Sequence, residues 1–223
     1  MDIDYATACS GFAKAYQGVD RLAAGLSRHD LLAASRCRGW LVADVLNHVL
    51  ADAQRALIGL ASPVPGPATV DFASYWRAFA DAGADDEVPH IWAVRRSAAS
   101  FRDGVGNVVL WRETSPAAVR AATAADPGGF ITTQDHVLSV PDFLVTLATE
   151  AVIHHLDMTV NVPNAPAPHP DALNLAVMTL DRLGTAVDRP PEWSIEKYVL
   201  KATGRLPLTP TEQAASLGYP LLR

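Results

Sequence analysis

The stretch ATEAVIHHLDMTV, residues 148–160, carries a glutamate, two adjacent histidines and an aspartate in a segment otherwise apolar enough for a protein core. Burying such groups is costly, so we expect them to serve a purpose. On a helix, Glu150 and His154 are one turn apart, with side chains about 40° apart on one face. Asp157 continues that face. His155 points about 140° away from Glu150, toward the apolar stripe, and cannot share a ligand with it.

Three interpretations of Glu150 and His154 remain open at this point. The pair is a hydrogen-bonded surface couple, part of a divalent-metal site, or a general acid–base pair that works without a metal. A metal site needs a further ligand from another helix. The stretch WLVADVLNHVLADAQRAL supplies one candidate, because His48 lies at the edge of its apolar stripe. Taken alone, a histidine at the edge of a stripe is more often simply a packed or half-exposed residue.

Helical periodicity dominates the elements that must position these residues. It predicts helices over residues 4–27, 42–60, about 140–160 and 171–188. Ser139 is expected to cap the third of these, with Asp142 opposite it and Pro141 in the first turn. The tail is expected to form two short helices, closed by Gly204 and Gly218.

Two further regions are less regular. Residues 70–103 read as a helical region interrupted near Gly83 and Pro89. NVVLWRE, residues 107–113, has a composition that favours a short strand or an extended connector. Ser115 and Pro116 then read as the N-cap and first residue of another helix. The expected fold is all-α, a bundle of four long helices with short additional helices and at most a minor strand or connector.

Composition narrows the functional classes. The chain has 223 residues, 49% of them hydrophobic, and a formal charge of −6 with no basic run. That argues against a nucleic-acid groove. We expect no membrane helix, because no apolar stretch reaches about 18 residues. The N-terminus lacks the pattern of a secretory signal, and Cys9 and Cys37 read as reduced thiols. A cytoplasmic monomer or homodimer is therefore expected.

Two motifs resemble a known family. CRGWLVADVLNH, residues 37–48, resembles the N-terminal motif of the DinB-like superfamily, particularly the branch of mycothiol-dependent maleylpyruvate isomerase and mycothiol S-transferases. TEAVIHHLDMTV, residues 149–160, resembles its second motif, and VLKATGRLP resembles tails of shorter actinobacterial members. The resemblance spans residues 5–205. It implies a four-helix bundle that holds a divalent metal, zinc before nickel or manganese, through His48, Glu150 and His154.

The resemblance also implies a chemistry. Members use a low-molecular-weight thiol such as mycothiol, which attacks a small electrophile in S-transfer or thiol-assisted isomerisation. Asp157 is then a candidate to orient His154 or to bind the thiol, with a solvated surface carboxylate as the alternative, and His155 is a candidate proton shuttle, pocket wall or core histidine. Trp40 is expected to be a hydrophobic anchor, while His29, His90, His136 and His169 are expected at the surface or in loops.

The chain departs from the family pattern in several places. Arg38 stands for the usual proline, Leu41 for a capping Ser or Thr, and His155 and Leu156 for a small or basic residue and a tryptophan. These changes leave two alternatives: a metal-dependent hydrolase, cyclase or lyase that has abandoned the thiol, and a non-catalytic metal-binding bundle.

The isomerase carries a second domain, for which this chain is too short. We expect residues 1–190 to form the bundle and 191–223 an extension that caps it.

Overall fold

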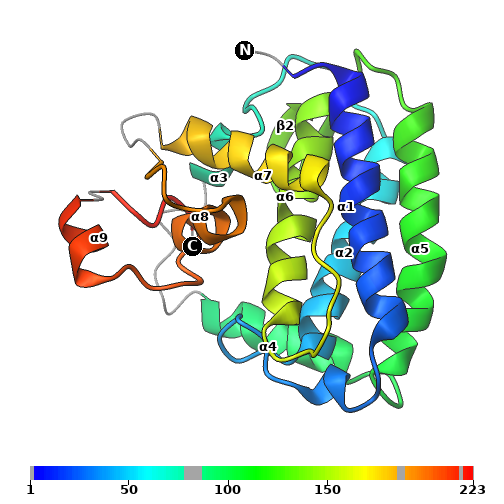
Figure 1. Ribbon diagram of the computed structural model, residues 1–223. Helices are drawn as coiled ribbons and strands as arrows, with labels where there is room; N and C mark the ends of the chain where they lie inside the picture. Colours follow the sequence, from blue (N-terminus) through cyan, green and yellow to red (C-terminus); the bar gives the residue numbers. More distant parts are fainter. Residues whose placement is uncertain (1–2, 78–86, 185–188, 216–217, 223) are drawn as a thin grey trace.

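Four long helices form the body of the protein (Figure 1). The computed structural model describes residues 3–77, 87–184, 189–215 and 218–222. The bundle helices are α1 (Tyr5–Gly25), α2 (Val42–Ala61), α5 (Val105–Ala124) and α6 (Val140–Thr159). Helices α1 and α2 each pack against both α5 and α6. The predicted all-α bundle is confirmed.

Shorter elements surround this bundle. A 3₁₀ turn η1 (Asp30–Leu32) precedes α2, and α3 (Ser74–Arg77) and α4 (Glu87–Ala98) follow it. A two-stranded antiparallel hairpin of β1 (Phe130–Thr133) and β2 (His136–Ser139) leads into α6. Helix α7 (Pro170–Leu183) covers α6, and α8 (Ile195–Ala202) and α9 (Pro210–Ala215) form the tail.

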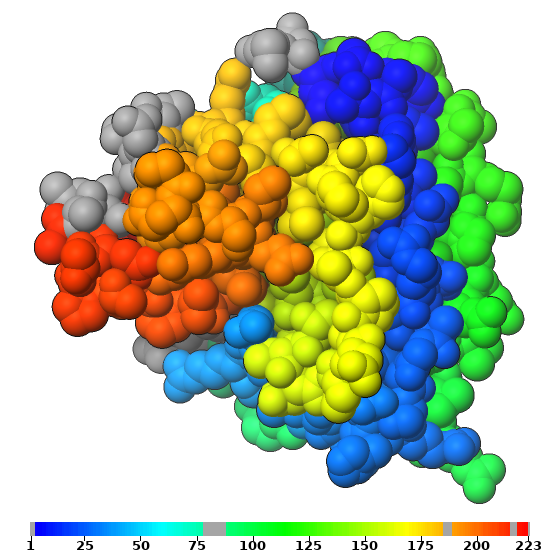
Figure 2. All heavy atoms as spheres, in the orientation of Figure 1, coloured from blue at the N-terminus to red at the C-terminus, as the bar shows by residue number. Residues whose placement is uncertain are grey.

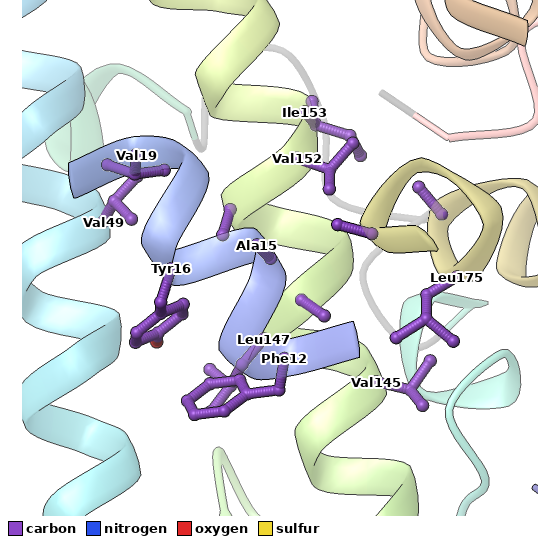
Figure 3. Packing of buried hydrophobic residues seen from close by; sticks show 14 of the residues in the cluster. Phe12, Ala15, Tyr16, Val19, Val49, Val145, Leu147, Val152, Ile153 and Leu175 are labelled. Atoms are coloured by element: carbon purple, nitrogen blue, oxygen red, sulfur yellow. The ribbon is translucent and has the colours of Figure 1, made fainter. Parts of the chain in front are cut away.

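Helix α6 is the centre of the molecule. It begins as predicted, since Ser139 accepts a hydrogen bond from the Asp142 amide at 3.2 Å. It is packed by α1, α2 and α7, so nearly every one of its side chains is buried. Figure 3 shows side chains of this core coming from α1, α2, α6 and α7. A helix surrounded in this way is mostly apolar on all sides, so its few ionisable residues must be paired with one another or with groups from neighbouring segments.

The prediction for residues 107–116 was wrong. NVVLWRE is neither a strand nor a connector but part of α5, which begins ten residues before Ser115. Ser115 is a buried interior residue, and Pro116 lies inside the helix on its exposed side. The carbonyl four residues earlier, on exposed Arg112, lies on the solvent side of the helix, where water can compensate for the missing amide donor. The buried face of α5 consists of Asn107, Trp111, Thr114, Ser115, Ala118 and Ala122.

Two smaller features also differ from the sequence prediction. Pro89 does not interrupt a helix but lies in the first turn of α4, where proline is tolerated, and Gly83 lies outside the described residues. The hairpin before α6 was not predicted. Its turn residues, Gln134 and Asp135, both have positive φ, 47° and 64°, the conformation of a two-residue hairpin turn usually made by Asn-Gly.

The tail folds back onto the bundle. Helix α8 packs against α7 and α6, and Figure 2 shows the orange C-terminal segment against the yellow segment that contains α7. Gly204 follows α8 with φ +69°, as expected for a glycine that ends a helix. The division at residue 190 stays a prediction. Within the described residues, no helix is long and apolar enough to cross a membrane.

We predict that Trp111→Ala lowers the free energy of unfolding by about 3–5 kcal/mol, because it empties a fully buried site between helices. The matched control is Val109→Ala on the same helix, since Val109 is 53% exposed and should change stability by less than about 0.5 kcal/mol. Urea unfolding followed by circular dichroism measures both. Equal losses would contradict the helical placement of residues 107–113.

Candidate metal centre

Glu150, His154 and Asp157 form a continuous polar row along buried α6. The two nitrogens of His154 point to different carboxylates: Nε2 lies 3.0 Å from Glu150 Oε2, and Nδ1 lies 3.0 Å from Asp157 Oδ2. His154 is 5% exposed and Asp157 is fully buried. Glu150 and Asp157, which were predicted to share a helix face with His154, are therefore both in direct contact with it.

His48 reaches this row from α2. Its ring centroid is 4.8 Å from that of His154, with the two rings nearly perpendicular. Helix α2 begins without a side-chain cap on Leu41, and the Asp44 carboxylate instead accepts the Leu41 amide hydrogen at 2.8 Å. One ligand-type atom each from His48, Glu150 and His154 lies within 4.8 Å of the others. The structure thus brings the three predicted ligands together from two helices.

The loop before α2 and the helix α4 cover the site on the side where His48 lies. Trp40, predicted as a hydrophobic anchor, is buried, and its ring lies against those of His48 and His90. Its indole N–H donates to the Ile91 carbonyl oxygen at 3.3 Å, which ties the loop to α4. Gly39 precedes it at φ +80°, and a Cβ there would meet Ile91 Cγ2 at 3.2 Å. The close approach of loop and helix therefore requires glycine.

Asp157 supports His154 from the far side. Its Oδ2 accepts hydrogen bonds from His154 Nδ1, from the Cys37 thiol at 3.1 Å and from Arg205 Nε at 3.0 Å. Arg205 Nε also lies 3.0 Å from Oδ1. A carboxylate in this place fixes the ring orientation and the Nδ1–H tautomer of a histidine whose other nitrogen binds elsewhere.

The charges of the row are strongly coupled. Burial alone would raise the pKa of Glu150, but the hydrogen bond from His154 and the nearby His48 outweigh it and lower that pKa to about 2. Burial would lower the pKa of His154, yet its hydrogen bonds to Asp157, Cys37 and Glu150 raise it well above the usual value. Burial, followed by the charge of His154, lowers the pKa of His48 to about 3. In the absence of an ion, these contacts therefore favour the ionised form of Glu150 and the protonated form of His154, and disfavour the protonated form of His48.

His155 lies apart from this row. Its Nε2 donates to the Pro166 carbonyl oxygen at 2.7 Å, and its Nδ1 lies 3.4 Å from where a Cβ on Gly18 of α1 would be. Burial lowers its pKa to about 4, so it is neutral at ordinary pH. Of the roles considered for it, this environment favours the packed core histidine over the proton shuttle.

Besides Cys37 and Arg205, two further neighbours of the site, His90 and Asp52, were given no role in it by the sequence analysis. His90 is exposed, as predicted, but its ring centroid lies 5.5 Å from that of His48. Asp52 lies one turn beyond His48 on α2, and burial with the nearby Glu150 raises its pKa to about 7, although Arg55 donates to it at 2.9 Å. The i, i+4 spacing of His48 and Asp52 was a usable signal, whereas His90 had none. His29, before η1, and His169, whose side chain caps α7, lie at helix ends as expected, whereas His136 lies half-buried on strand β2 and not in a loop.

Among the residues that the structure describes, two groups of side chains have the donor types and spacing for a cation, and they share His154: His48–Glu150–His154 and Cys37–His154–Asp157. The second group is already occupied by a positive charge, because Arg205 donates to both Asp157 oxygens. The first group offers two imidazoles and a carboxylate, a donor set that suits zinc, nickel or manganese. The His48–Glu150–His154 group is therefore better suited to a divalent ion than the Cys37–His154–Asp157 group.

Comparison with known proteins agrees with the motifs. A family model described as the mycothiol maleylpyruvate isomerase N-terminal domain matches residues 12–159, about two thirds of the chain. The chain belongs to this family. No curated protein and no solved structure gave a match. The part that matches the mycothiol maleylpyruvate isomerase N-terminal domain includes His48, Glu150, His154 and Asp157, while Arg205 lies beyond it.

We predict that Asp157→Asn lowers the free energy of unfolding of the metal-free protein by about 3 kcal/mol, because it leaves the guanidinium of Arg205 without its counter-charge. Asp171→Asn is the matched control. It removes the exposed ion pair with Lys14 and should cost less than about 1 kcal/mol. Chemical unfolding in the presence of a chelator measures both. A loss for Asp157→Asn no larger than that of the control would show that this network contributes little.

Proposed function

We propose that this chain is a divalent-metal-dependent enzyme that activates a low-molecular-weight thiol, of the mycothiol type, for addition to a small electrophile. The observation that carries the proposal is the convergence of His48, Glu150 and His154, from two helices, within 4.8 Å of one another. The family description supports it by naming a mycothiol-dependent reaction. Zinc is the first choice of ion, because two imidazoles and one carboxylate are a common donor set for catalytic zinc.

Three protein ligands leave a coordination position open, as in catalytic rather than structural sites. When bound there, a divalent ion would supply Lewis acidity that lowers the pKa of a thiol or water reaching that position. Glu150 contributes one negative charge and the histidines none once His154 has lost its Nε2 proton, so the centre keeps a net positive charge.

The residues of the chain have separate tasks in this reaction. His48, Glu150 and His154 hold the ion, and Asp157 keeps the Nδ1 hydrogen of His154 pointing away from it. Trp40 covers His48 on one side and limits the access of water. Glu150 is the most exposed of the α6 members, with 21% of its side chain accessible, so the row is reached from solvent on its side. His155 serves the packing of α1 against α6.

We predict one divalent ion per chain in protein purified without a histidine tag. His48→Ala should remove it, because two ligands on α6 alone bind weakly, whereas Cys37→Ser should retain it, since the group that contains Cys37 is filled by Arg205. Elemental analysis after dialysis measures the stoichiometry. Loss of the ion from Cys37→Ser but not from His48→Ala would place the metal in the other group and contradict the proposal.

We further predict that the zinc-loaded protein accelerates the conjugation of mycothiol with monochlorobimane. In this reaction the sulfur–carbon bond forms, the carbon–chlorine bond breaks, chloride leaves and the thiol proton goes to solvent. His48→Ala should lower kcat/KM at least about 100-fold, because the thiol loses its activating ion. Fluorescence of the conjugate measures the rate.

His155→Gln is the matched control for this assay, since its side chain faces Pro166 and not the site. It should retain most of the activity. A parent protein that contains stoichiometric metal but forms conjugate no faster than His48→Ala would contradict the thiol mechanism and favour a hydrolytic or non-catalytic role.

A further inference from the structure

Arg205 comes from outside the segment that matches the family, yet it contacts the innermost carboxylate of the site. Its Nε lies 3.0 Å from both oxygens of Asp157, and only 18% of its side chain is accessible. Asp157 in turn holds Nδ1 of His154, whose Nε2 faces Glu150. A chain of direct contacts therefore runs from the C-terminal tail to a proposed metal ligand.

The end of α8 fixes this arginine rigidly. Gly204 adopts φ +69° and its amide donates to the Lys201 carbonyl oxygen at 3.1 Å, while the Arg205 amide donates to that of Leu200 at 2.8 Å. These two bonds form the Schellman motif, in which the residue after the glycine is held against the last turn of the helix. The guanidinium also donates through Nη1 to the Thr203 carbonyl oxygen at 3.0 Å. Backbone and side chain are thus both fixed.

Helix α8 itself is held against α7 and α9 by contacts that do not involve the site. Tyr198 donates its hydroxyl hydrogen to Asp181 of α7 at 2.7 Å. Lys201, which is buried, pairs with Glu212 of α9, and Trp193 donates to the same carboxylate at 2.9 Å. Figure 1 shows α8 beside α7, next to the central helix α6. The position of Arg205 therefore depends on a docked tail.

We infer that the tail is part of the metal centre: Arg205 is a positioning residue that, through Asp157, holds His154 in the orientation that binds the ion. This inference rests on the proposed function, since it concerns the same ion. Removing the direct hydrogen-bond partner of a metal ligand typically weakens metal binding 10- to 100-fold, and Arg205 holds that partner, Asp157, in place. The effect is expected on ion affinity and on ligand geometry, and not only on catalytic rate.

The test is titration of the metal-free full chain with Co²⁺ in competition with a chelator, followed by the visible absorption of the bound ion. Arg205→Gln should bind Co²⁺ about tenfold more weakly than the parent and shift its absorption bands. Arg205→Lys keeps the charge without the planar group and should lie between them. In a double-mutant cycle, Asp157→Asn with Arg205→Gln should bind no more weakly than Asp157→Asn alone, because Arg205 acts through Asp157.

Two controls separate positioning from general tail docking. Tyr198→Phe removes the hydrogen bond between α8 and α7, and Arg182→Gln removes the exposed pair with Asp71. Both should bind Co²⁺ as the parent does. Parent-like binding by Arg205→Gln and Arg205→Lys, or equal weakening by Tyr198→Phe, would overturn the inference while leaving the proposed function standing. A parent that binds no ion at His48, Glu150 and His154 would instead overturn the proposed function, and the inference with it.

Discussion

The structure depends on how one buried helix accommodates its charges. Helix α6 is packed by α1, α2 and α7, yet it carries two carboxylates with an imidazole between them. An ionised carboxylate removed from water costs several kcal/mol unless it is paired and hydrogen-bonded. The chain meets that cost by placing His154 between the two carboxylates and by bringing Arg205 from the tail to Asp157.

The same arrangement explains why one histidine in the pair is a metal-ligand candidate and the other is not. His154 lies between two acceptors, so its two nitrogens take different and complementary partners. His155, one residue further, is rotated toward α1, and its Nε2 donates to the Pro166 carbonyl oxygen. The two adjacent histidines therefore have different roles, because a helix turns about 100° per residue. His154 makes electrostatic contacts, and His155 packs against α1.

Much of the fold was predictable where apolar residues mark the buried face. Helix α6 and its Ser139 cap follow from the sequence, as do α1, α2 and α7. Helix α5 was partly missed because its buried face includes Asn107, Thr114 and Ser115, which an apolar pattern does not detect. Asn107 is buried since it accepts a hydrogen bond from Asn47 of α2, a contact visible only once both helices are placed.

The residues of the site also divide into those that the sequence predicts and those that it does not. Glu150, His154 and Asp157 were predictable because their partners are local, three or four residues apart. Cys37 lies 120 residues from Asp157 in sequence and Arg205 lies 48 residues from it, so tertiary packing alone brings them together. His90 is placed beside His48 by the docking of α4, for which neither its spacing nor its surroundings gave a signal.

Asp157 joins three stretches of chain at one residue. Its side chain contacts the loop before α2 through Cys37 and the tail through Arg205. Its carbonyl oxygen accepts a hydrogen bond from the Arg36 amide at 3.0 Å. None of these stretches can lift away from the bundle without breaking a bond to the same residue. The loop before α2, the central helix α6 and the tail should therefore unfold together as one cooperative unit. Binding of an ion would then also stabilise the tail against local unfolding.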